Sequence, residues 1–395
     1  MDAAKTSTGR YYRPELDVLR FVAFLLVFFH HSLSHMSSSG FHGVVKVLVH
    51  IFIDFVYACR FGLSLFFTLS AFLICELLLR ERATAGGVAV KQFYIRRILR
   101  IWPLYYFGLA LGVAYTFLPI GHGLDAAKLG WFAIFLGAWY NASHAILVTP
   151  ANVLWSISVE EQFYLFAPWV IKYFNRRRLF SFCGVIIVAT NLFLIYMVRK
   201  GYPSDSAWYN SVVQFECFAG GILLCLVLRS RTPRLAIWSR LLFVIGCGIF
   251  WRIANHWLFL ADNYAPVDPK VSWFLMGGYA LITLGCVLLL LAFLGVAPGL
   301  LPQRLIYLGR ISFGLYVYHD FFIFMIRSLS VSAILNQAKL AYPLYIFLFT
   351  LLTIGLPLGL TVLAAALSYR YFEMPFLKMK KRYAAIESQP IAGAS

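Results

Sequence analysis

The amino-acid sequence predicts an all-α polytopic membrane protein, and three observations support this fold class. Of the 395 residues, 61% are hydrophobic and only 13% are charged, and the mean hydropathy is +0.78. A soluble globular domain of this size does not have such a composition. Apolar runs near or above the roughly 20 residues that an α-helix needs to cross a bilayer recur along the chain, and short basic clusters lie between them.

The apolar runs predict about ten transmembrane helices. Their approximate ranges are 17–36, 61–79, 101–119, 152–173, 179–198, 211–229, 237–258, 272–294, 307–327 and 343–367. When these helices are threaded alternately from a cytoplasmic N-terminus, most of the 34 Lys and Arg residues fall on the cytoplasmic side. The positive-inside rule therefore favours cytoplasmic N- and C-termini.

Two further apolar segments are not counted as spans. Residues 41–60 carry Asp54 and other polar groups, which favours an interfacial helix on the outer side. Residues 131–148 include His144, and a span here would move the basic cluster 176–178 to the outside. An outer interfacial or re-entrant segment is therefore the better interpretation of residues 131–148.

The domain organisation follows from these helices. We expect a cytoplasmic N-terminal segment at 1–16, a transmembrane domain at 17–376, and a cytoplasmic tail at 377–395 that is basic and then loose. No appended soluble domain is expected. The first apolar run has no small-residue cleavage site, so we expect it to be retained in the mature protein.

Charge and cysteine content exclude several classes of partner. The net charge is +18, but the basic residues form short clusters and not one continuous patch. This pattern indicates contact with membrane lipids and not with nucleic acid. The seven cysteines are scattered, with no Cys-x-x-Cys motif and no His/Cys ligand cluster, so neither a disulfide framework nor a metal site is expected.

Two ionisable residues inside the first apolar run mark a candidate site. Arg20 and His31 are eleven residues apart in this run. An ionisable side chain inside hydrocarbon costs several kcal/mol and usually marks a functional site. On a helix this separation corresponds to about 16 Å, close to half the apolar thickness of a bilayer. Arg20 therefore lies near a membrane face and His31 near the midplane, which suits a protein that handles one ligand at the surface and another inside.

A second candidate site is the basic cluster Arg96, Arg97 and Arg100 at the start of a predicted span. Like charges crowded on one helix are unfavourable unless an anion neutralises them, and guanidinium groups bind phosphate in a bidentate way. Two interpretations remain open. The cluster is either a topology signal on anionic lipid or a cytoplasmic site for a polyphosphate ligand.

Carboxylates and histidines in later spans complete the candidates. Ser156, Glu160 and Tyr164 share one helix face, and Glu161 adds an adjacent carboxylate. The alternative is a solvated pair of carboxylates at the start of the helix. Further candidates inside predicted spans are Glu216 and the pair His319 and Asp320, for which an internal polar contact between packed helices is the alternative.

Six motifs follow one another along the chain. They are Leu16 to Arg20 with His31, Phe66 to Leu73, Arg96 to Pro103, Trp155 to Tyr164, Leu308 to His319, and Arg370 to Pro375. Together they resemble the signature of the acyltransferase-3 family of membrane acyltransferases, in which an arginine precedes a histidine by ten intervening residues. The resemblance spans about residues 15 to 376. Any one of these motifs has low specificity, whereas six in order are a specific signal.

The resemblance implies an enzyme that transfers an acyl group, acetyl being the expected one, from cytoplasmic acyl-CoA to a hydroxyl of a carbohydrate or lipid-linked glycan. The expected location is the bacterial inner membrane. The chain departs from the family pattern at Ala71, where glycine is frequent, at Ser64, where an acidic residue is common, and at Val213, where an arginine often stands. The acceptor side is therefore less well defined than the donor side.

Roles for the candidate residues follow from the same resemblance. We expect Arg96, Arg97 and Arg100 to bind the CoA phosphates, with Arg20 close to them. His31 would be the general base or would carry the acyl group as an acyl-enzyme, and these two roles remain open. Glu160 would orient the acceptor or polarise a histidine from the outer side. Supporting or acceptor-side roles are expected for Ser156, Glu161, Tyr164, Glu216 and His319.

Two functions of other classes remain as alternatives. A proton-coupled transporter or flippase of sugars or lipid-linked glycans would also carry His, Glu and Arg inside the membrane, but the inverted repeats and broken half-helices typical of such carriers are not found. A membrane scaffold or sensor would use the basic loops only to contact anionic lipid. Specific stabilisation by CoA would distinguish the enzyme from both.

Overall fold

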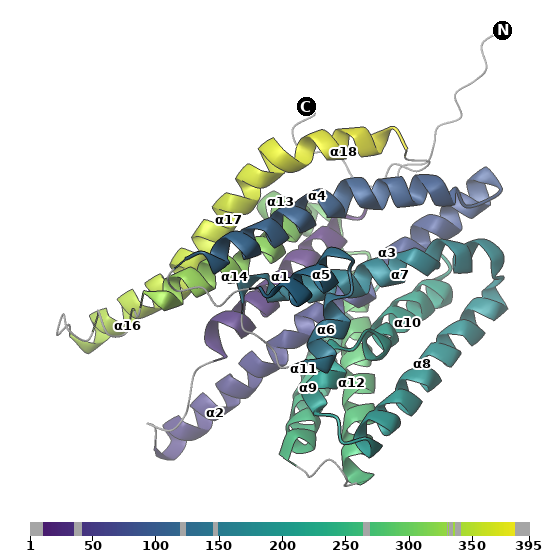
Figure 1. The fold of residues 1–395 in the computed structure, drawn as a ribbon. Coiled ribbons are helices and arrows are strands. Elements are labelled where there is room, and N and C mark those ends of the chain that lie inside the picture. The colour runs from purple at the N-terminus through teal and green to yellow at the C-terminus, as the bar shows by residue number, and fades with distance from the viewer. Residues whose placement is uncertain are drawn as a thin grey trace.

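The computed structural model describes residues 11–34, 42–118, 124–144, 149–263, 269–329, 331, 335 and 341–383. This part of the chain is helical and contains no β-strand, which confirms the predicted all-α class (Figure 1). The helices are α1 (Pro14–Leu33), α2 (Gly43–Ala58), α3 (Gly62–Ala85), α4 (Val90–Thr116), α5 (Ala126–Ala133), α6 (Gly137–Ser143), α7 (Trp155–Tyr173), α8 (Arg176–Arg199), α9 (Ser204–Tyr209), α10 (Ser211–Leu228), α11 (Ile237–Asn263), α12 (Pro269–Phe293), α13 (Gln303–Arg310), α14 (Ser312–Ser328), α16 (Tyr342–Thr350), α17 (Leu356–Ser368) and α18 (Met374–Lys381).

Within the described residues, 8 helical runs are long and apolar enough to cross a membrane. These runs are Pro14–Leu33, Gly43–Ala85, Val90–Thr116, Arg176–Arg199, Ser211–Leu228, Ile237–Asp262, Lys270–Phe293 and Leu344–Lys381. The polytopic membrane fold is thereby confirmed, whereas the number of ten spans and the side of the termini stay predictions.

The two remaining predicted spans fall short for physical reasons. Helix α7 carries Glu160, Glu161 and Lys172 within its 19 residues. The segment 307–327 is divided between α13 and α14, which meet at Ile311, and α14 has only 17 residues.

The segment 41–60 is not the separate interfacial helix that the sequence favours. Helix α2 continues through a 3₁₀ turn, Cys59–Phe61, into α3. Large apolar side chains such as Val44 and Leu48 are exposed along α2. The combined run of 43 residues extends about 65 Å, which exceeds the roughly 45 Å thickness of a bilayer with its headgroups. The segment therefore continues a candidate span, and its place at the outer membrane interface stays a prediction.

The segment 131–148 contains the end of α5 and the whole of α6. Helix α5 has 8 residues and α6 has 7, so neither is long enough to cross a bilayer. This agrees with the expectation that the segment is not a span, although residues 145–148 lie outside the described residues. The tail beyond Tyr383 is likewise outside them, and its looseness stays a prediction.

Helix α1 packs at the centre of the bundle against α3, α13 and α14 (Figure 1). It begins at Pro14, whose fixed φ angle and missing N–H group suit the first position of a helix. Its closest neighbour is Gly309 of α13, where an added Cβ would lie 1.8 Å from the backbone oxygen of Asp17. Only glycine permits this approach, which sets the position of α13 beside the start of α1.

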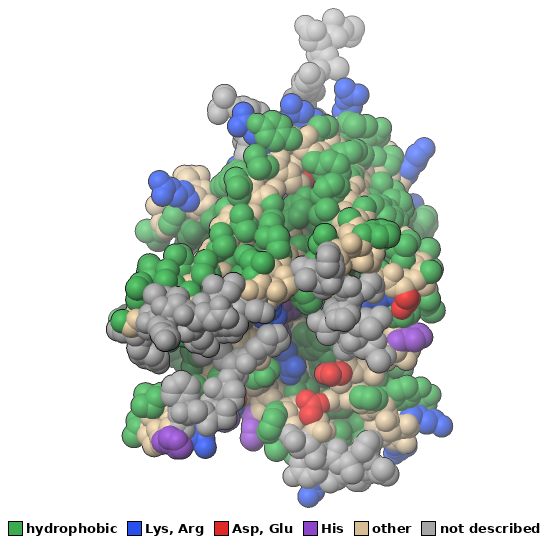
Figure 2. Space-filling view, turned by 60° about the vertical axis from the view of Figure 1, so that its left-hand side comes forward, with side chains coloured by type: hydrophobic (Ala, Val, Ile, Leu, Met, Phe, Trp, Pro, Cys, Tyr) green, Lys and Arg blue, Asp and Glu red, His purple; other side chains and the backbone are tan. Residues whose placement is uncertain are grey.

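The outer surface of the bundle is apolar. Exposed large side chains include Val185 and Leu192 on α8 and Leu242 and Ile249 on α11. Figure 2 shows hydrophobic side chains over much of the visible face, with Lys and Arg gathered at its upper end and charged groups of both signs in its lower part. A protein in water does not expose so much contiguous apolar surface, whereas lipid tails cover it without cost.

The last described helices form one continuous run along α4 (Figure 1). Two π-helical segments, Leu351–Gly355 and Tyr369–Glu373, join α16, α17 and α18. Arg96 of α4 donates a hydrogen bond of 2.7 Å to the backbone oxygen of Tyr383. This contact fixes the basic end of α18 beside the arginines of α4.

The contact between α1 and α13 generates the first prediction. Gly309→Ala should lower the Tm by several degrees, because the new methyl group meets backbone and overpacking costs about 1–3 kcal/mol. The measurement is thermal unfolding in detergent. Gly248→Ala on α11 is the control, since no atom lies within 4 Å of the added methyl group. An equal Tm for Gly309→Ala and wild type would contradict the packing described here.

Candidate active site

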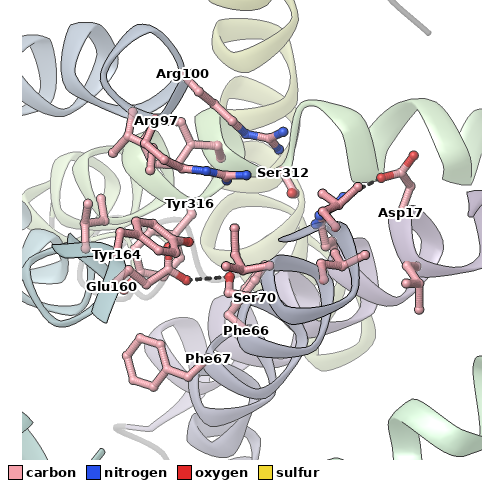
Figure 3. A pocket seen from close by; sticks show the side chains of 18 of the residues that line it. Asp17, Phe66, Phe67, Ser70, Arg97, Arg100, Glu160, Tyr164, Ser312 and Tyr316 are labelled. Atoms are coloured by element: carbon pink, nitrogen blue, oxygen red, sulfur yellow. Dashed lines mark hydrogen bonds and ion pairs between the residues drawn. The ribbon is translucent and has the colours of Figure 1, made fainter. Parts of the chain in front are cut away.

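A cavity that we call the arginine pocket lies between α1, α3, α4, α7 and α14. Its empty volume, including the part that is open to solvent, is about 1110 Å³. This volume is large enough for a small-molecule ligand. Its lining residues include Tyr11, Tyr12, Arg13, Asp17, Arg20, Leu63, Phe66, Phe67, Ser70, Arg97, Arg100, Ser156, Glu160, Tyr164, Ser312 and Tyr316. Figure 3 shows Arg97 and Arg100 above the joined side chains of Ser70 and Glu160.

The structure brings Arg20 together with two arginines of the predicted cluster. Arg20 forms an ion pair with Asp17 at 2.6 Å, and the buried Asp17 also accepts a hydrogen bond of 2.9 Å from Tyr12. Arg20 and Arg100 are close enough for their charges to repel each other. The pocket therefore carries more positive than negative charge, which favours an anionic ligand.

Arg97 lines this pocket without forming an ion pair with a described residue, although Glu160 and Glu161 attract it electrostatically. It forms no hydrogen bond or ion pair with any described residue, and its Nε atom is buried without a partner. Its guanidinium contacts the rings of Phe93 and Tyr164, at 5.5 and 5.3 Å from the ring centroids. A buried guanidinium without an anion is costly, so the geometry is prepared for a ligand that supplies one.

Helix α7 presents a polar face to the arginine pocket, as its i, i+4, i+8 spacing predicts. Glu160 accepts hydrogen bonds of 3.0 Å from both Ser70 and Tyr164 (Figure 3). Ser156 lies further along the same face. Glu160 is thus placed near the arginines, whereas the expected contact of Glu160 with a histidine is not found.

Three other predicted residues lie outside the arginine pocket. Arg96 forms an ion pair of 3.0 Å with Glu81, which separates it from Arg97 and Arg100. Glu161 accepts a hydrogen bond of 3.0 Å from Trp102. Glu216 is buried in α10, and its Oε2 atom has no hydrogen-bond partner among the described residues. Neither carboxylate lines one of the two pockets described here.

A second cavity, which we call the histidine pocket, contains His31. It encloses about 930 Å³ of empty space and is also open to solvent. Its lining residues are Val27, His30, His31, Ser34, Arg60, Leu63, Thr149, Asn152, Val153, Trp155, Trp208, Tyr209, Tyr316, Asp320, Phe324 and Arg327. Leu63 and Tyr316 line both pockets, so the two cavities meet at these side chains.

Tyr316 is held firmly at the junction of the two pockets. Its hydroxyl donates a hydrogen bond of 2.9 Å to the backbone oxygen of Val153 and lies 2.7 Å from the hydroxyl of Ser156. Arg20 and His31 therefore lie on opposite sides of this junction, one in each pocket. A ligand that extends from one pocket to the other must pass Leu63 and Tyr316.

His31 is coupled to two residues of α14. The Nδ1 atom of His31 lies 3.1 Å from Nε2 of His319 and 3.4 Å from Oδ1 of Asp320. The other ring nitrogen of His319, Nδ1, lies 2.6 Å from the backbone oxygen of Tyr316, to which only an N–H can donate. His319 then accepts through Nε2, so the proton of neutral His31 is assigned to Nδ1 and the lone pair to its Nε2.

Among the described residues, His31, His319 and Asp320 are also close enough together to hold a metal ion. One donor atom from each of His31, His319 and Asp320 lies within 4.8 Å of the others. The distances fit hydrogen bonding between the three side chains, which satisfies their donors without an ion. The expectation of no metal stays a prediction.

Sequence analysis did not predict every feature of the site. Asp320 was a candidate because it lies beside His319 inside an apolar run, but its contact with His31 was not predicted. Arg60 precedes an apolar run and was assigned to the interfacial segment. Lys380 of α18 is close enough to Arg97 and Arg100 to add to their positive charge. His30, the neighbour of His31 on α1, also lines the histidine pocket.

Comparisons with known proteins identify the family and several relatives of this chain. The family model described as an acyltransferase domain matches residues 13–362. The proteins named Putative O-acetyltransferase of Staphylococcus aureus strains MSSA476 and MRSA252 are 24% identical over 393 residues, covering 93% of this chain and 58% of their own length. The O-acetyltransferase OatA of strain NCTC 8325 is 22% identical over 389 residues, covering 93% of this chain and 57% of its own length. No solved structure matches the chain.

The different surroundings of Arg96 and Arg97 generate the second prediction. Arg96→Gln should lower the free energy of unfolding by about 3 kcal/mol, because it leaves Glu81 buried without its ion pair. Arg97→Gln should leave the Tm unchanged or raise it, because it removes an uncompensated charge. Thermal unfolding of both variants in ligand-free detergent tests the contrast, and an equal loss of stability would contradict it.

Proposed function

The chain belongs to the acyltransferase-3 family of membrane acyltransferases, and from this premise we propose that it transfers an acetyl group from acetyl-CoA to a hydroxyl of a carbohydrate or lipid-linked glycan. The observation that carries the proposal is the pair of pockets that meet at Leu63 and Tyr316. One pocket supplies Arg97, which forms no ion pair with a described residue, and the other supplies a histidine with an available lone pair.

The arginine pocket supports binding of the CoA phosphates. Arg97 forms no ion pair with a described residue, and Arg100 adds further positive charge nearby. Guanidinium groups bind phosphate through paired, charge-assisted hydrogen bonds. In this proposal Arg97 and Arg100 bind the phosphates, while Arg96 stabilises the fold through Glu81. The pantetheine arm and its thioester then extend past Tyr316 toward His31.

The histidine pocket supports general-base catalysis by His31. The acceptor hydroxyl gives its proton to Nε2 of His31 while its oxygen attacks the thioester carbon. The C–S bond breaks, and the CoA thiolate takes the proton from His31, so that the products are the acetyl ester and CoA. Asp320, 3.4 Å from Nδ1, stabilises the transient imidazolium. An acetyl-histidine intermediate uses the same nitrogen and remains the alternative.

The orientation in the membrane follows from the charges around the arginine pocket. Arg13, Arg80 and Lys380 lie at the end of the bundle that carries this pocket. The positive-inside rule therefore favours a cytoplasmic arginine pocket and an outward-facing histidine pocket. In this orientation the donor binds from the cytoplasm and the acceptor from outside, and only the acetyl group crosses the membrane.

The names of the relatives support the reaction class. The relatives are named as O-acetyltransferases, and the chain spans less than three fifths of their length. The alternatives of a proton-coupled transporter and of a membrane scaffold do not account for the family match or for two pockets that share Leu63 and Tyr316. Specific stabilisation of the purified protein by acetyl-CoA separates the enzyme from both alternatives.

The third prediction concerns His31 and its neighbour. His31→Ala should reduce transfer of labelled acetyl from acetyl-CoA to a cell-envelope glycan fraction by about 10²–10⁴-fold. The same variant should keep its thermal stabilisation by acetyl-CoA, because the phosphates bind in the other pocket. Transfer is measured by radioactivity in the glycan fraction after incubation with purified protein.

The control for this prediction is His30→Ala. His30 lines the same pocket, but its Nδ1 lies 3.2 Å from the backbone oxygen of Val56 and it belongs to neither contact of His31 with α14. This variant should retain most of the transfer activity. A folded His31→Ala protein with full turnover would exclude His31 as base and as acyl carrier.

A further inference from the structure

We propose that Arg60 forms an anion-binding subsite in the histidine pocket and that the acceptor is a saccharide carrying a carboxylate or phosphate group. The identification of the bound saccharide as the acceptor rests on the proposed acetyl transfer. The existence of the anion-binding site rests only on the geometry of Arg60. The family motifs do not include this residue, which lies in the turn between α2 and α3.

Arg60 has no counter-charge within the described chain. Its guanidinium forms no hydrogen bond and no ion pair with a described residue, and its Nε atom is buried without a partner. Its contacts are the rings of Phe61 and Trp208, both 5.3 Å from the guanidinium carbon. An unneutralised guanidinium at this position in a membrane protein is costly and marks a functional site.

The nearest carboxylates do not neutralise Arg60. Asp205 and Asp262 attract it electrostatically, but both are exposed and neither forms an ion pair with it. Within the pocket, Asp320 is already paired with His31. A second arginine, Arg327, donates a hydrogen bond to the backbone oxygen of His31 and brings a further positive charge to the same cavity.

The remaining walls of the pocket suit a polar ring that carries the anion. Trp155 and Tyr209 stand edge to face at 4.8 Å, and Trp208 packs beside them. Asn152 and Thr149 add polar groups, and the hydroxyl of Thr149 has no partner in the described part of the chain. Aromatic walls with a few polar groups and one fixed charge are typical of sites that orient a small polar ligand.

The position of Arg60 relative to His31 gives the subsite its role. Both residues line the histidine pocket, whereas the arginines assigned to the donor line the other pocket. An anion bound at Arg60 would therefore orient the acceptor while one of its hydroxyls reaches His31. A neutral saccharide would leave the guanidinium of Arg60 uncompensated and would bind less tightly.

The test measures binding to the purified full-length protein in phosphatidylcholine nanodiscs. Thermal stability is recorded with sodium glucuronate, glucose 1-phosphate or methyl glucoside as probes. All proteins carry Arg97→Gln, so that anions do not bind at the unpaired arginine of the other pocket. The variants compared in this background are Arg60→Gln and Arg252→Gln. Arg252 is the matched control, since it lies outside the pocket and pairs with Asp54 at 2.8 Å.

The expected result is a saturable rise in Tm with at least one anionic saccharide and none with methyl glucoside. Arg60→Gln should weaken the apparent affinity at least tenfold, because it removes a charge-assisted contact, and Arg252→Gln should leave it unchanged. Stabilisation by glucuronate alone identifies a carboxylate, and stabilisation by glucose 1-phosphate alone identifies a phosphate. Arg60→Lys should retain part of the affinity, which separates loss of charge from misfolding.

Three outcomes would overturn the proposal. The first is no stabilisation by either anionic probe, and the second is equal affinity with and without Arg60. The third is that the saccharides have no effect, whereas phosphatidylglycerol in the nanodisc stabilises the protein in a way that depends on Arg60. The last outcome assigns Arg60 to a lipid headgroup. Acetyl transfer is measured separately, so a protein that binds the anion at Arg60 but does not transfer acetyl contradicts the proposed function and not the anion site.

Discussion

Neutralisation of buried charge is the constraint on which the rest of the structure depends. In an apolar helical bundle a charged side chain must have a partner, because water is not available to solvate it. Several arginines have such a partner: Arg20 pairs with Asp17, Arg96 with Glu81, and Arg252 with Asp54. Arg97 and Arg60 do not, and each lines one of the two pockets. The lack of an ion pair with any described residue is therefore the feature on which we propose that Arg97 and Arg60 bind ligands.

Helix α1 connects the two pockets. Its first turns place Arg20 in the arginine pocket, and its last turn places His31 in the histidine pocket. The close approach of Gly309 to Asp17 fixes the start of α1, and the contacts of His319 and Asp320 with His31 fix its end. In the proposed reaction, this arrangement would separate recognition of the donor from the reacting groups along a single helix. It accounts for the eleven-residue spacing of Arg20 and His31 that the sequence alone presents as an anomaly.

The sequence was sufficient to predict the fold class and to predict which residues share a face of a single helix. Hydropathy predicts the helices, and helical spacing predicts the shared face of Ser156, Glu160 and Tyr164, because both depend only on local sequence. Contacts between distant helices were not predictable in the same way. The carboxylate beside His31 is Asp320 and not Glu160, since the rotation of α7 and α14 is set by packing. Arg96 and Arg97 are neighbours in sequence, yet only the position of Glu81 decides which of them is neutralised.

The most direct test of the account is a structure of the protein bound to a non-hydrolysable thioether analogue of acetyl-CoA. The account predicts the phosphates of the analogue on Arg97 and Arg100, its pantetheine arm passing Leu63 and Tyr316, and its thioether in contact with His31. An analogue whose phosphates lie away from Arg97, or whose thioether does not reach the histidine pocket, would contradict the central claim that one donor extends through both pockets.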